Sequence, residues 1–503
     1  MANTREKRAK LNIIISFLTQ IVSMVCGIIL PKVLLGAYGS EAYGATSSIT
    51  HFLAYITLLE GGISGVARAA LYKPLAEKDS AKVSAVVDEI KRFFRILGMV
   101  FVVYVLILAC SFKSISHIEV MDWSSTFLLV LVISISTFGQ YFIGISNSIL
   151  LQAAQQKYVT YVITIIAVLL NTVLSCVLVN MGFSLIAVKF VSSCVYVLRP
   201  IAMWLYVRKN FTLVKVTQRD KGALSQKWTA MGQHIAYFLH NNTDVAVLTV
   251  LANLATVAVY SVYNMVVAQI QSLTVSFTAG MESLFGDMLA RDEREKLNTA
   301  FNIYETMISM VSVVLFSVTS AMIVPFVKLY TAGISDAEYI QPAFALLLVI
   351  AAFTYCLRLP YNYVVNAAGH FRQTRMAAYG EAAVNIVTSV VLVFRFGLIG
   401  VAIGTVAANM FRFVYYVWYL SGHIIHRPVS LCVKREAVNL VDFALVMLLG
   451  QAVTSVISVG SYLTWAVCAA IVTVLTAALT ALSNLLFYRD SFRAVLRKVG
   501  IRW

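Results

Sequence analysis

Ionisable residues at helical spacing inside a long apolar segment are the strongest candidates for chemistry in this sequence. His240 and Asp244 lie four residues apart, so they share one face of a helix. His234, Tyr237 and Asn241 fall within about 120° of them, at about 100° per residue. A carboxylate beside a group that titrates near neutral pH predicts a site for a coupling cation, either Na⁺ or H⁺.

Polar residues also share one face in three other apolar segments. In the first span these residues are Asn12, Ser16, Thr19, Gln20 and Ser23, and in the second they are Thr50, Thr57, Ser64 and Arg68, with Glu60 at the edge of their stripe. In the eighth span they are Tyr260, Tyr263, Asn264, Gln271, Thr274 and Thr278. A polar face is costly against lipid, so we expect these stripes to line a water-filled cavity that binds a substrate. The alternative is that the Ser and Thr residues only hydrogen-bond between helices.

Arginines inside apolar segments are separate candidates. Arg68 would either extend to the membrane surface or hold a lipid phosphate at the cytoplasmic mouth. Arg358 is a candidate for the substrate cavity, but Glu381 lies at a similar depth, and a structural ion pair between these two is the favoured interpretation. The sequence suggests no partner for Arg412.

Membrane-spanning helices must position these residues. The 503-residue chain is 60% hydrophobic and 12% charged, with a mean hydropathy of +0.83, which is more apolar surface than a soluble protein can hide. A spanning helix needs about 20 apolar residues. We therefore predict an all-α membrane protein with about fourteen transmembrane helices, at 11–35, 41–66, 93–112, 123–150, 158–180, 183–207, 230–254, 256–281, 302–327, 342–365, 378–396, 398–421, 437–459 and 461–487.

The placement of lysine and arginine predicts the orientation. Of 39 such residues, 31 lie in or beside the loops on the side of the N-terminus, three lie in the opposite loops and five lie within helices. Cytoplasmic loops carry the positive excess, so both termini are predicted to be cytoplasmic. The two long inner loops, 67–92 and 208–229, are basic and are expected to be solvated or to lie on the anionic leaflet. A net charge of +16 spread over short loops does not predict a nucleic-acid partner.

Catalytic and metal-binding motifs are not found in the sequence. The seven cysteines are scattered, with no CxxC and no Cys/His cluster, so we predict neither a disulfide framework nor a metal site. The outer loops are short and there is no DxD motif. We therefore predict that the protein is not an enzyme.

Two parts of the sequence resemble each other. LLQAAQQKYVTYVITIIAVLLNTVLS at 150–175 aligns with VVNAAGHFRQTRMAAYGEAAVNIVTS at 364–389 at an offset of 214, which pairs Asn171 with Asn385. Six helices separate the copies, so the two halves have the same orientation in the membrane.

This repeat predicts two pseudo-symmetric six-helix lobes followed by two C-terminal helices. The predicted parts are an N-lobe at 1–207, a cytoplasmic linker at 208–229, a C-lobe at 230–421, and the last two helices with a basic tail at 422–503.

The segment GAYGSEAYGATSSITHFLAYITLLEGGISGVARAALYKPLAEKD at 36–79 resembles the first two helices of bacterial polysaccharide flippases of the MATE/oligosaccharide-flippase/MurJ-like (MOP) superfamily. The segments NNTDVAVLTV, VAVYSVYNMV, LRLPYNYVVNAAGHFRQT and FGLIGVAIGTVAANMFR carry the same resemblance, which covers 11–421. The resemblance implies alternating access between two lobes in the bacterial plasma membrane. It also implies export of a lipid-linked oligosaccharide on an undecaprenyl-pyrophosphate-type lipid, with membrane lipids and polysaccharide-synthesis proteins as partners.

Members of this superfamily often hold the pyrophosphate with cations of the cavity. This chain departs from that pattern, because the first helix has no arginine near its middle and Lys32 lies off the polar stripe. The candidate substitutes are Arg68, His234, His240 and Arg358.

Three other functions stay open at this point. A cation-coupled exporter of drugs or organic solutes would come from the same superfamily; such exporters usually have twelve helices and many have an acidic residue in the first. Here the first helix has none, although Asp244 would serve. A membrane glycosyltransferase or polymerase would need a catalytic outer loop. A scaffold that does not transport is the third alternative.

Overall fold

The computed structural model of the chain contains helices joined by turns and loops, and no strand, in the residues it describes. These are 2–60, 63–214, 231–278 and 280–498, and within them the side chains of 2–7, 9, 231–237, 239–241 and 498 are outside the description. Among these described residues, twelve helices are long and apolar enough to cross a membrane. The prediction of an all-α, multi-pass membrane protein is confirmed.

The chain divides into two compact units. Unit 1 comprises Met1–Phe238 and Asn253–Ala258, and unit 2 comprises Leu239–Ala252 and Val259–Trp503. The predicted lobe boundaries at 207 and 421 stay predictions.

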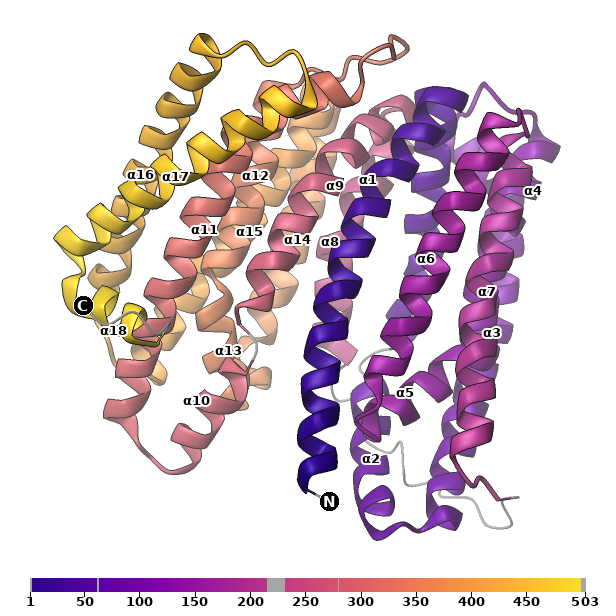
Figure 1. The fold of residues 1–503 in the computed structure, drawn as a ribbon, viewed down its shortest axis with the longest axis horizontal. Helices are drawn as coiled ribbons and strands as arrows, with labels where there is room; N and C mark the ends of the chain where they lie inside the picture. The colour runs from indigo at the N-terminus through magenta and orange to yellow at the C-terminus, as the bar shows by residue number, and fades with distance from the viewer. Residues whose placement is uncertain (1, 61–62, 215–230, 279, 499–503) are drawn as a thin grey trace. The chain divides into compact units, whose positions relative to one another are not determined.

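The helices of unit 1 can be followed from indigo to magenta in Figure 1. They are α1 (Ala2–Ala54), η1 (Tyr55–Leu59), α2 (Ile63–Glu77), α3 (Ser80–Ser116), α4 (Trp123–Gly139), η2 (Gln140–Gly144), α5 (Ile145–Ala153), α6 (Lys157–Asn180) and α7 (Leu185–Asn210). Most of α8 (Met231–Leu251) and most of α9 (Leu254–Ser276) belong to unit 2. Unit 2 also contains α10 (Met281–Ala290), α11 (Arg294–Tyr330), α12 (Pro342–Leu357), α13 (Leu359–Ala367), α14 (Phe371–Phe396), α15 (Leu398–His423), α16 (Val429–Val456), α17 (Tyr462–Phe487) and α18 (Arg489–Lys498).

Gly39 divides the longest helix into two spans. The first candidate span, Lys10–Leu59, has 50 residues and would be about 75 Å long if straight, more than twice the ~30 Å hydrocarbon core. Gly39 has a φ of 81° and a ψ of 173°, a backbone that favours glycine. Asn12 is hydrogen-bonded to the turn between α5 and α6, Glu41 to the loop between α3 and α4, and Arg68 to α5 again. The chain therefore reverses direction at Gly39. Counting the two spans separately and adding α8 brings the number to the predicted fourteen.

The prediction of a long inner loop at 67–92 is wrong. Helices α2 and α3 run through this region and are separated by a short turn at Lys78 and Asp79. The Asp79 side chain accepts a hydrogen bond from the backbone N–H of Lys82 at 2.9 Å and so caps α3. This bond also holds the pKa of Asp79 below its usual value. Hydropathy marks only the apolar part of a helix, whereas α2 and α3 also include the polar residues that follow or precede that part.

The internal repeat is visible in the helix boundaries. Helices α6 and α14 begin 214 residues apart. Helices α7 and α15 both have 26 residues, and they begin and end 213 residues apart. The two helix pairs are therefore equivalent elements of the two units. At these offsets Asn171 corresponds to Asn385 and Arg199 corresponds to Arg412.

A buried ion network holds α13, α14 and α15 together in unit 2. Glu381 is fully buried, and its two carboxylate oxygens accept from Arg358 and from Arg412. The guanidinium of Arg412 also donates to the hydroxyl of Tyr416 at 2.9 Å. The favoured pairing of Arg358 with Glu381 is confirmed, and Arg412, for which the sequence suggested no partner, joins the same carboxylate.

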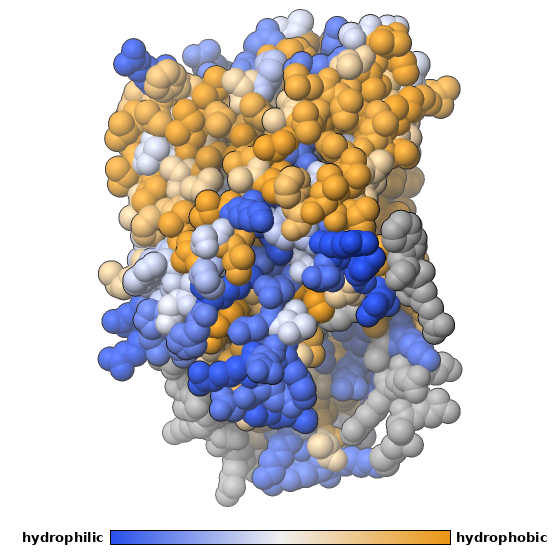
Figure 2. Space-filling view, turned by 90° about the vertical axis from the view of Figure 1, so that its left-hand side faces the viewer, coloured by the Kyte–Doolittle hydropathy of each residue, from blue (hydrophilic) through white to orange (hydrophobic). Residues whose placement is uncertain are grey.

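A second network of one glutamate and two arginines joins α11 to α16 and to the loop before it, within unit 2. Glu305 of α11 accepts from Arg427 at 2.7 Å and from Arg435 of α16 at 2.8 Å. Figure 2 shows the face of the molecule on the side of α16 and α17, with apolar side chains gathered above polar ones. The exposed apolar residues of these two helices include Leu440, Val441, Leu448, Val456, Leu463, Val467, Val474, Leu482 and Leu486. Such a surface is suited to lipid.

Candidate functional site

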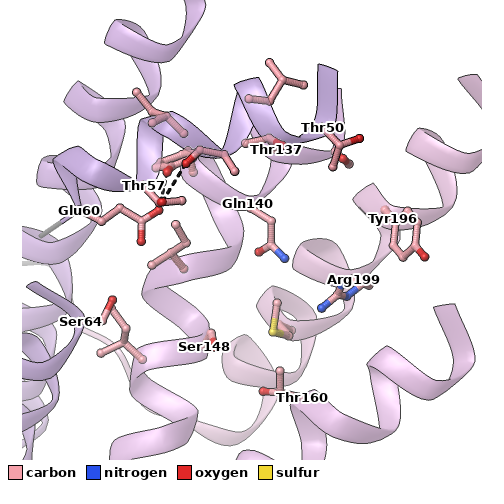
Figure 3. Close-up of a pocket in the computed structure, with 18 of the residues that line it drawn as sticks. Thr50, Thr57, Glu60, Ser64, Thr137, Gln140, Ser148, Thr160, Tyr196 and Arg199 are labelled. Atoms are coloured by element: carbon pink, nitrogen blue, oxygen red, sulfur yellow. Dashed lines mark hydrogen bonds between the residues drawn. The ribbon is translucent and has the colours of Figure 1, made fainter. Parts of the chain in front are cut away.

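A polar cavity lies inside unit 1, within the membrane-spanning part of its helices. Its volume is about 640 Å³, which is in the range of small-molecule sites. Figure 3 shows polar side chains entering it from several helices, with Glu60 and Arg199 on opposite sides. The polar lining residues are Thr50, Thr57, Glu60, Ser64, Ser136, Thr137, Gln140, Tyr141, Ser148, Gln152, Thr160, Tyr196 and Arg199. Hydroxyl and amide groups dominate, with one carboxylate and one guanidinium.

Irregular helical turns bring the acidic side of the cavity together. Glu60 directly follows the 3₁₀ turn η1, and the π turn η2 carries Tyr141. The buried hydroxyl of Tyr141 donates to the Glu60 carboxylate. π turns inside α-helices are frequent at functional sites.

Close packing of α4 against α7 positions the basic side. A Cβ added at Gly139 would lie 3.3 Å from the ring of Pro200, and one at Gly144 would lie 3.1 Å from it. The absence of side chains at these glycines lets η2 approach Pro200, the neighbour of Arg199. The Arg199 guanidinium donates to the hydroxyl of Thr164 at 3.2 Å and lies 5.8 Å from the ring centre of Tyr196.

The predicted stripe of the second span contributes most of its members to this cavity. Thr50, Thr57, Glu60 and Ser64 all line it. Arg68 does not line the cavity, but its guanidinium donates to the side-chain oxygen of Gln152, a lining residue, at 3.2 Å. Arg68 thus lies one hydrogen bond from the cavity.

A second polar site surrounds Asp244 in unit 2. The buried carboxylate accepts from Thr405 at 2.8 Å, from Tyr260 at 3.2 Å and from Asn385 at 3.4 Å. These partners come from α9, α14 and α15 and are all neutral. A small cavity of about 150 Å³ adjoins the site, and Asn409 also lines it.

The donor set around Asp244 fits a small monovalent cation or a proton. Asn385 contacts Asp244, and Asn409 lines the adjoining cavity. Among the described residues, the side-chain oxygens of both asparagines are buried without a hydrogen-bond partner, so each oxygen could still accept a hydrogen bond or bind a cation. Hard cations prefer such oxygen ligands. The described residues contain no group of three His, Cys, Asp or Glu that could hold a metal ion.

The predicted stripe of α9 is divided in the structure. Tyr260, Asn264 and Gln271 line the small cavity beside Asp244. Tyr263 instead donates to the backbone carbonyl of Tyr339 at 2.8 Å and lines neither cavity. Thr274 and Thr278 contact backbone carbonyls of their own segment. The hydroxyl of Thr278 also lies 2.9 Å from the hydroxyl of Tyr363 in α13, a contact between helices of the kind that the alternative interpretation expects.

Five other predicted site residues are not seen to line either cavity. The side chains of His234, Tyr237, His240 and Asn241 lie outside the described residues, although α8 includes their backbone. Arg358 is 4% exposed and held by Glu381, which removes it from direct contact with a substrate in this conformation.

Residues of the fourth and sixth spans were missed by the sequence analysis. Gln140, Tyr141, Gln152 and Arg199 line the cavity of unit 1, yet no single stripe in the sequence groups them. The pairing of Asn171 with Asn385 in the repeat was the available signal for the Asp244 site, because Asn385 is one of the partners of that carboxylate.

The fold is similar to that of solved membrane transporters. One is "Lipid II flippase MurJ, inward closed conformation", with a TM-score of 0.71, 13% identity, and coverage of 95% of this chain and 99% of that chain. Another is an inward-facing multidrug resistance MATE family transporter of the MOP superfamily, with a TM-score of 0.62, 14% identity, and coverage of 79% and 95%. An outward-facing MATE transporter has a TM-score of 0.55, 17% identity, and coverage of 86% and 97%.

These likenesses establish the fold, which is that of MOP-superfamily transporters. No protein-family model and no curated protein sequence matches the chain.

Proposed function

We propose that this protein exports a lipid-linked oligosaccharide across the bacterial plasma membrane by alternating access, for the synthesis of a cell-surface polysaccharide. Both termini would lie in the cytoplasm, and the protein would act as a transporter rather than as an enzyme. Membrane lipids and proteins of polysaccharide synthesis would be its partners.

The extent of the structural similarity is the observation that carries this proposal. The likeness to the lipid II flippase extends over 95% of the chain, whereas the MATE likenesses quoted above cover 79% and 86%. A lipid-linked saccharide has the same general design as the cargo named for that flippase, with a polar head and a lipid tail.

The chemistry of the unit 1 cavity supports a saccharide head group. Its lining contains two glutamine amides, several hydroxyls, one carboxylate and two tyrosine rings. Such groups can donate to and accept from sugar hydroxyls. A volume of about 640 Å³ would hold a part of an oligosaccharide at a time.

Asp244 would bind the coupling ion, Na⁺ or H⁺. Asp244, Asn385 and Thr405 bring one carboxylate, one amide group and one hydroxyl together from three helices. The amide nitrogen of Asn385 donates to Asp244, and its side-chain oxygen is buried without a partner among the described residues. Binding of a cation would neutralise a buried charge and favour the packing of these helices. His240 is the second predicted residue of this coupling site.

A cation-coupled exporter of drugs or other organic solutes is the second candidate function. Its support is the similarity to MATE transporters with TM-scores of 0.62 and 0.55. The two functions differ in cargo, because a multidrug exporter needs no lipid-linked saccharide.

Mass spectrometry of lipids that copurify with the protein tests the cargo. We expect a polyprenyl-linked saccharide to be enriched over a membrane protein of similar size purified from the same cells. Equal amounts in both preparations, together with export of a cationic dye by the reconstituted protein, would favour the second candidate.

Asp244→Asn tests the coupling site. This change keeps the size of the side chain but removes its charge, so cargo movement in proteoliposomes should lose its dependence on a Na⁺ or proton gradient. Asp287→Asn, on an exposed residue of α10, is the matched control. Unchanged gradient dependence in both Asp244→Asn and His240→Ala would exclude this site as the coupling site.

A further inference from the structure

We infer that Arg199 is an anion-binding residue of the unit 1 cavity, and that it holds the phosphate group of the cargo. The inference rests on the proposed function for the identity of the cargo. The binding of an oxyanion by Arg199 is an independent claim about unit 1. It is carried by an asymmetry between the two copies of the repeat.

In unit 2, the equivalent arginine is neutralised inside the protein. Arg412 of α15 pairs with Glu381 of α14. The helix equivalent to α14 is α6, and the offset of 214 places Ala167 at the position of Glu381. The repeat therefore retains the arginine in both copies but retains the carboxylate in only one.

The contacts of Arg199 agree with this difference. Its hydrogen bond is to Thr164, which lies three residues before Ala167 on the same face of α6. Within the part of the chain that the structure describes, no carboxylate lies within 4.0 Å of this guanidinium, and its Nε is buried without a hydrogen-bond partner. The guanidinium of Arg199 therefore has N–H donors that are available to a ligand.

A guanidinium inside a membrane-spanning segment is costly without a counter-charge. Arg199 lies 14 residues from the start of α7 at Leu185 and 11 residues from its end at Asn210, so it lies about 16–21 Å from either end. It is too far inside to be solvated by bulk water in the way that a residue at the helix end would be. It does line the polar cavity, from which an anion can reach it.

The opposite wall of the cavity restricts what kind of anion is suitable. Glu60 repels an anion on its side and already accepts from Tyr141. The charged group of a ligand would therefore lie at Arg199, and its neutral hydroxyls would lie toward Glu60, Gln140 and Gln152. A saccharide joined to a phosphate has this arrangement of charge and hydroxyls, and the planar fork of arginine suits a phosphate.

Binding of prenyl pyrophosphate to the purified full-length protein in a neutral detergent tests this inference. The probes are farnesyl pyrophosphate, inorganic pyrophosphate and uncharged farnesol. We expect farnesyl pyrophosphate to bind and farnesol to bind at least tenfold more weakly. If inorganic pyrophosphate binds as tightly as farnesyl pyrophosphate, the result also supports an anion site. It would show that the anion alone is sufficient for binding and that the lipid chain is not needed.

Variants at two positions connect this binding to the asymmetry. Arg199→Gln removes the charge, and Ala167→Glu introduces the carboxylate that unit 2 has in Glu381. Each should weaken the binding of farnesyl pyrophosphate by about 10-fold to 100-fold, the range expected for loss of a charge-assisted bond. Ala167→Gln is the matched control, since it adds the same volume without charge, and it should stay within about threefold of the natural protein.

Stability supplies a readout that needs no ligand. Ala167→Glu should unfold at a higher temperature than Ala167→Gln, because the new carboxylate would compensate Arg199, and Arg199→Gln should abolish this difference. Affinities within threefold of the natural protein in both Arg199→Gln and Ala167→Glu would overturn the inference. Pyrophosphate binding that depends on Arg199, in a protein that copurifies with no lipid-linked saccharide, would keep the anion site and reject the proposed cargo.

Discussion

Replacing Glu381 with glutamine should destabilise the protein strongly. The side chain is fully buried and is the shared partner of Arg358 and Arg412. Removing one partner of a buried ion pair costs about 3–5 kcal/mol, because it leaves a buried charge uncompensated. Here two guanidinium groups lose the same carboxylate, so we expect at least this amount. That corresponds to a change of about a hundredfold or more in the unfolding equilibrium.

The assay is equilibrium unfolding of purified protein in mixed micelles, followed by circular dichroism. Asp287→Asn is the control, because the pair of Asp287 with Arg291 is 57% and 65% exposed and an exposed pair contributes about 0.5 kcal/mol. Arg412→Gln should cost less than Glu381→Gln, since it leaves Glu381 paired with Arg358. If Glu381→Gln shifts the transition no more than Asp287→Asn does, the account of α13–α15 as held together by this network is wrong.

Two further predictions concern orientation and packing. A reporter fused after Trp503 should be active only in the cytoplasm, because the positive charges predict an even number of spans; a periplasmic signal would contradict that number. Gly44→Val should lower the unfolding temperature and expose the turn between α8 and α9 to proteolysis, because a Cβ at Gly44 would lie 1.8 Å from the carbonyl oxygen of Leu254. Gly36→Val is the control, since nothing lies within 4 Å of its Cβ position, and equal behaviour of the two variants would argue against the close approach.

Much of the fold can be predicted from the sequence because the membrane imposes a simple pattern. Hydropathy locates the spans, and the loop charges check their number. The pattern fails at 67–92, where helices α2 and α3 run through the segment predicted as a loop and only Lys78 and Asp79 form a turn. Neither hydropathy nor charge records how far a helix continues in water.

The candidate sites are less predictable, because each is assembled from several helices. A stripe on one helix identified Thr50, Thr57 and Glu60, since periodicity within a single segment is visible in the sequence. The partners of Asp244 on α14 and α15 are 141 and 161 residues away, and no spacing rule reaches across that distance. Arg199 and Arg412 look alike in the sequence, and only the neighbouring helix decides that one is neutralised and the other faces a cavity.

The π turn at Gln140–Gly144 determines which side chains of α5, the helix that follows it, face the cavity of unit 1. The backbone N–H of Ile145 bonds to the carbonyl of Gln140, five residues earlier, so this turn contains one residue more than an α-helical turn. Deleting one residue there would restore a regular helix but rotate α5 by about 100°. Ser148 and Gln152 would then turn away from the cavity, and Gln152 would lose its bond with Arg68. Substitutions in this span are therefore more easily tolerated than a change in its length, because the cavity wall depends on a residue count as much as on residue types.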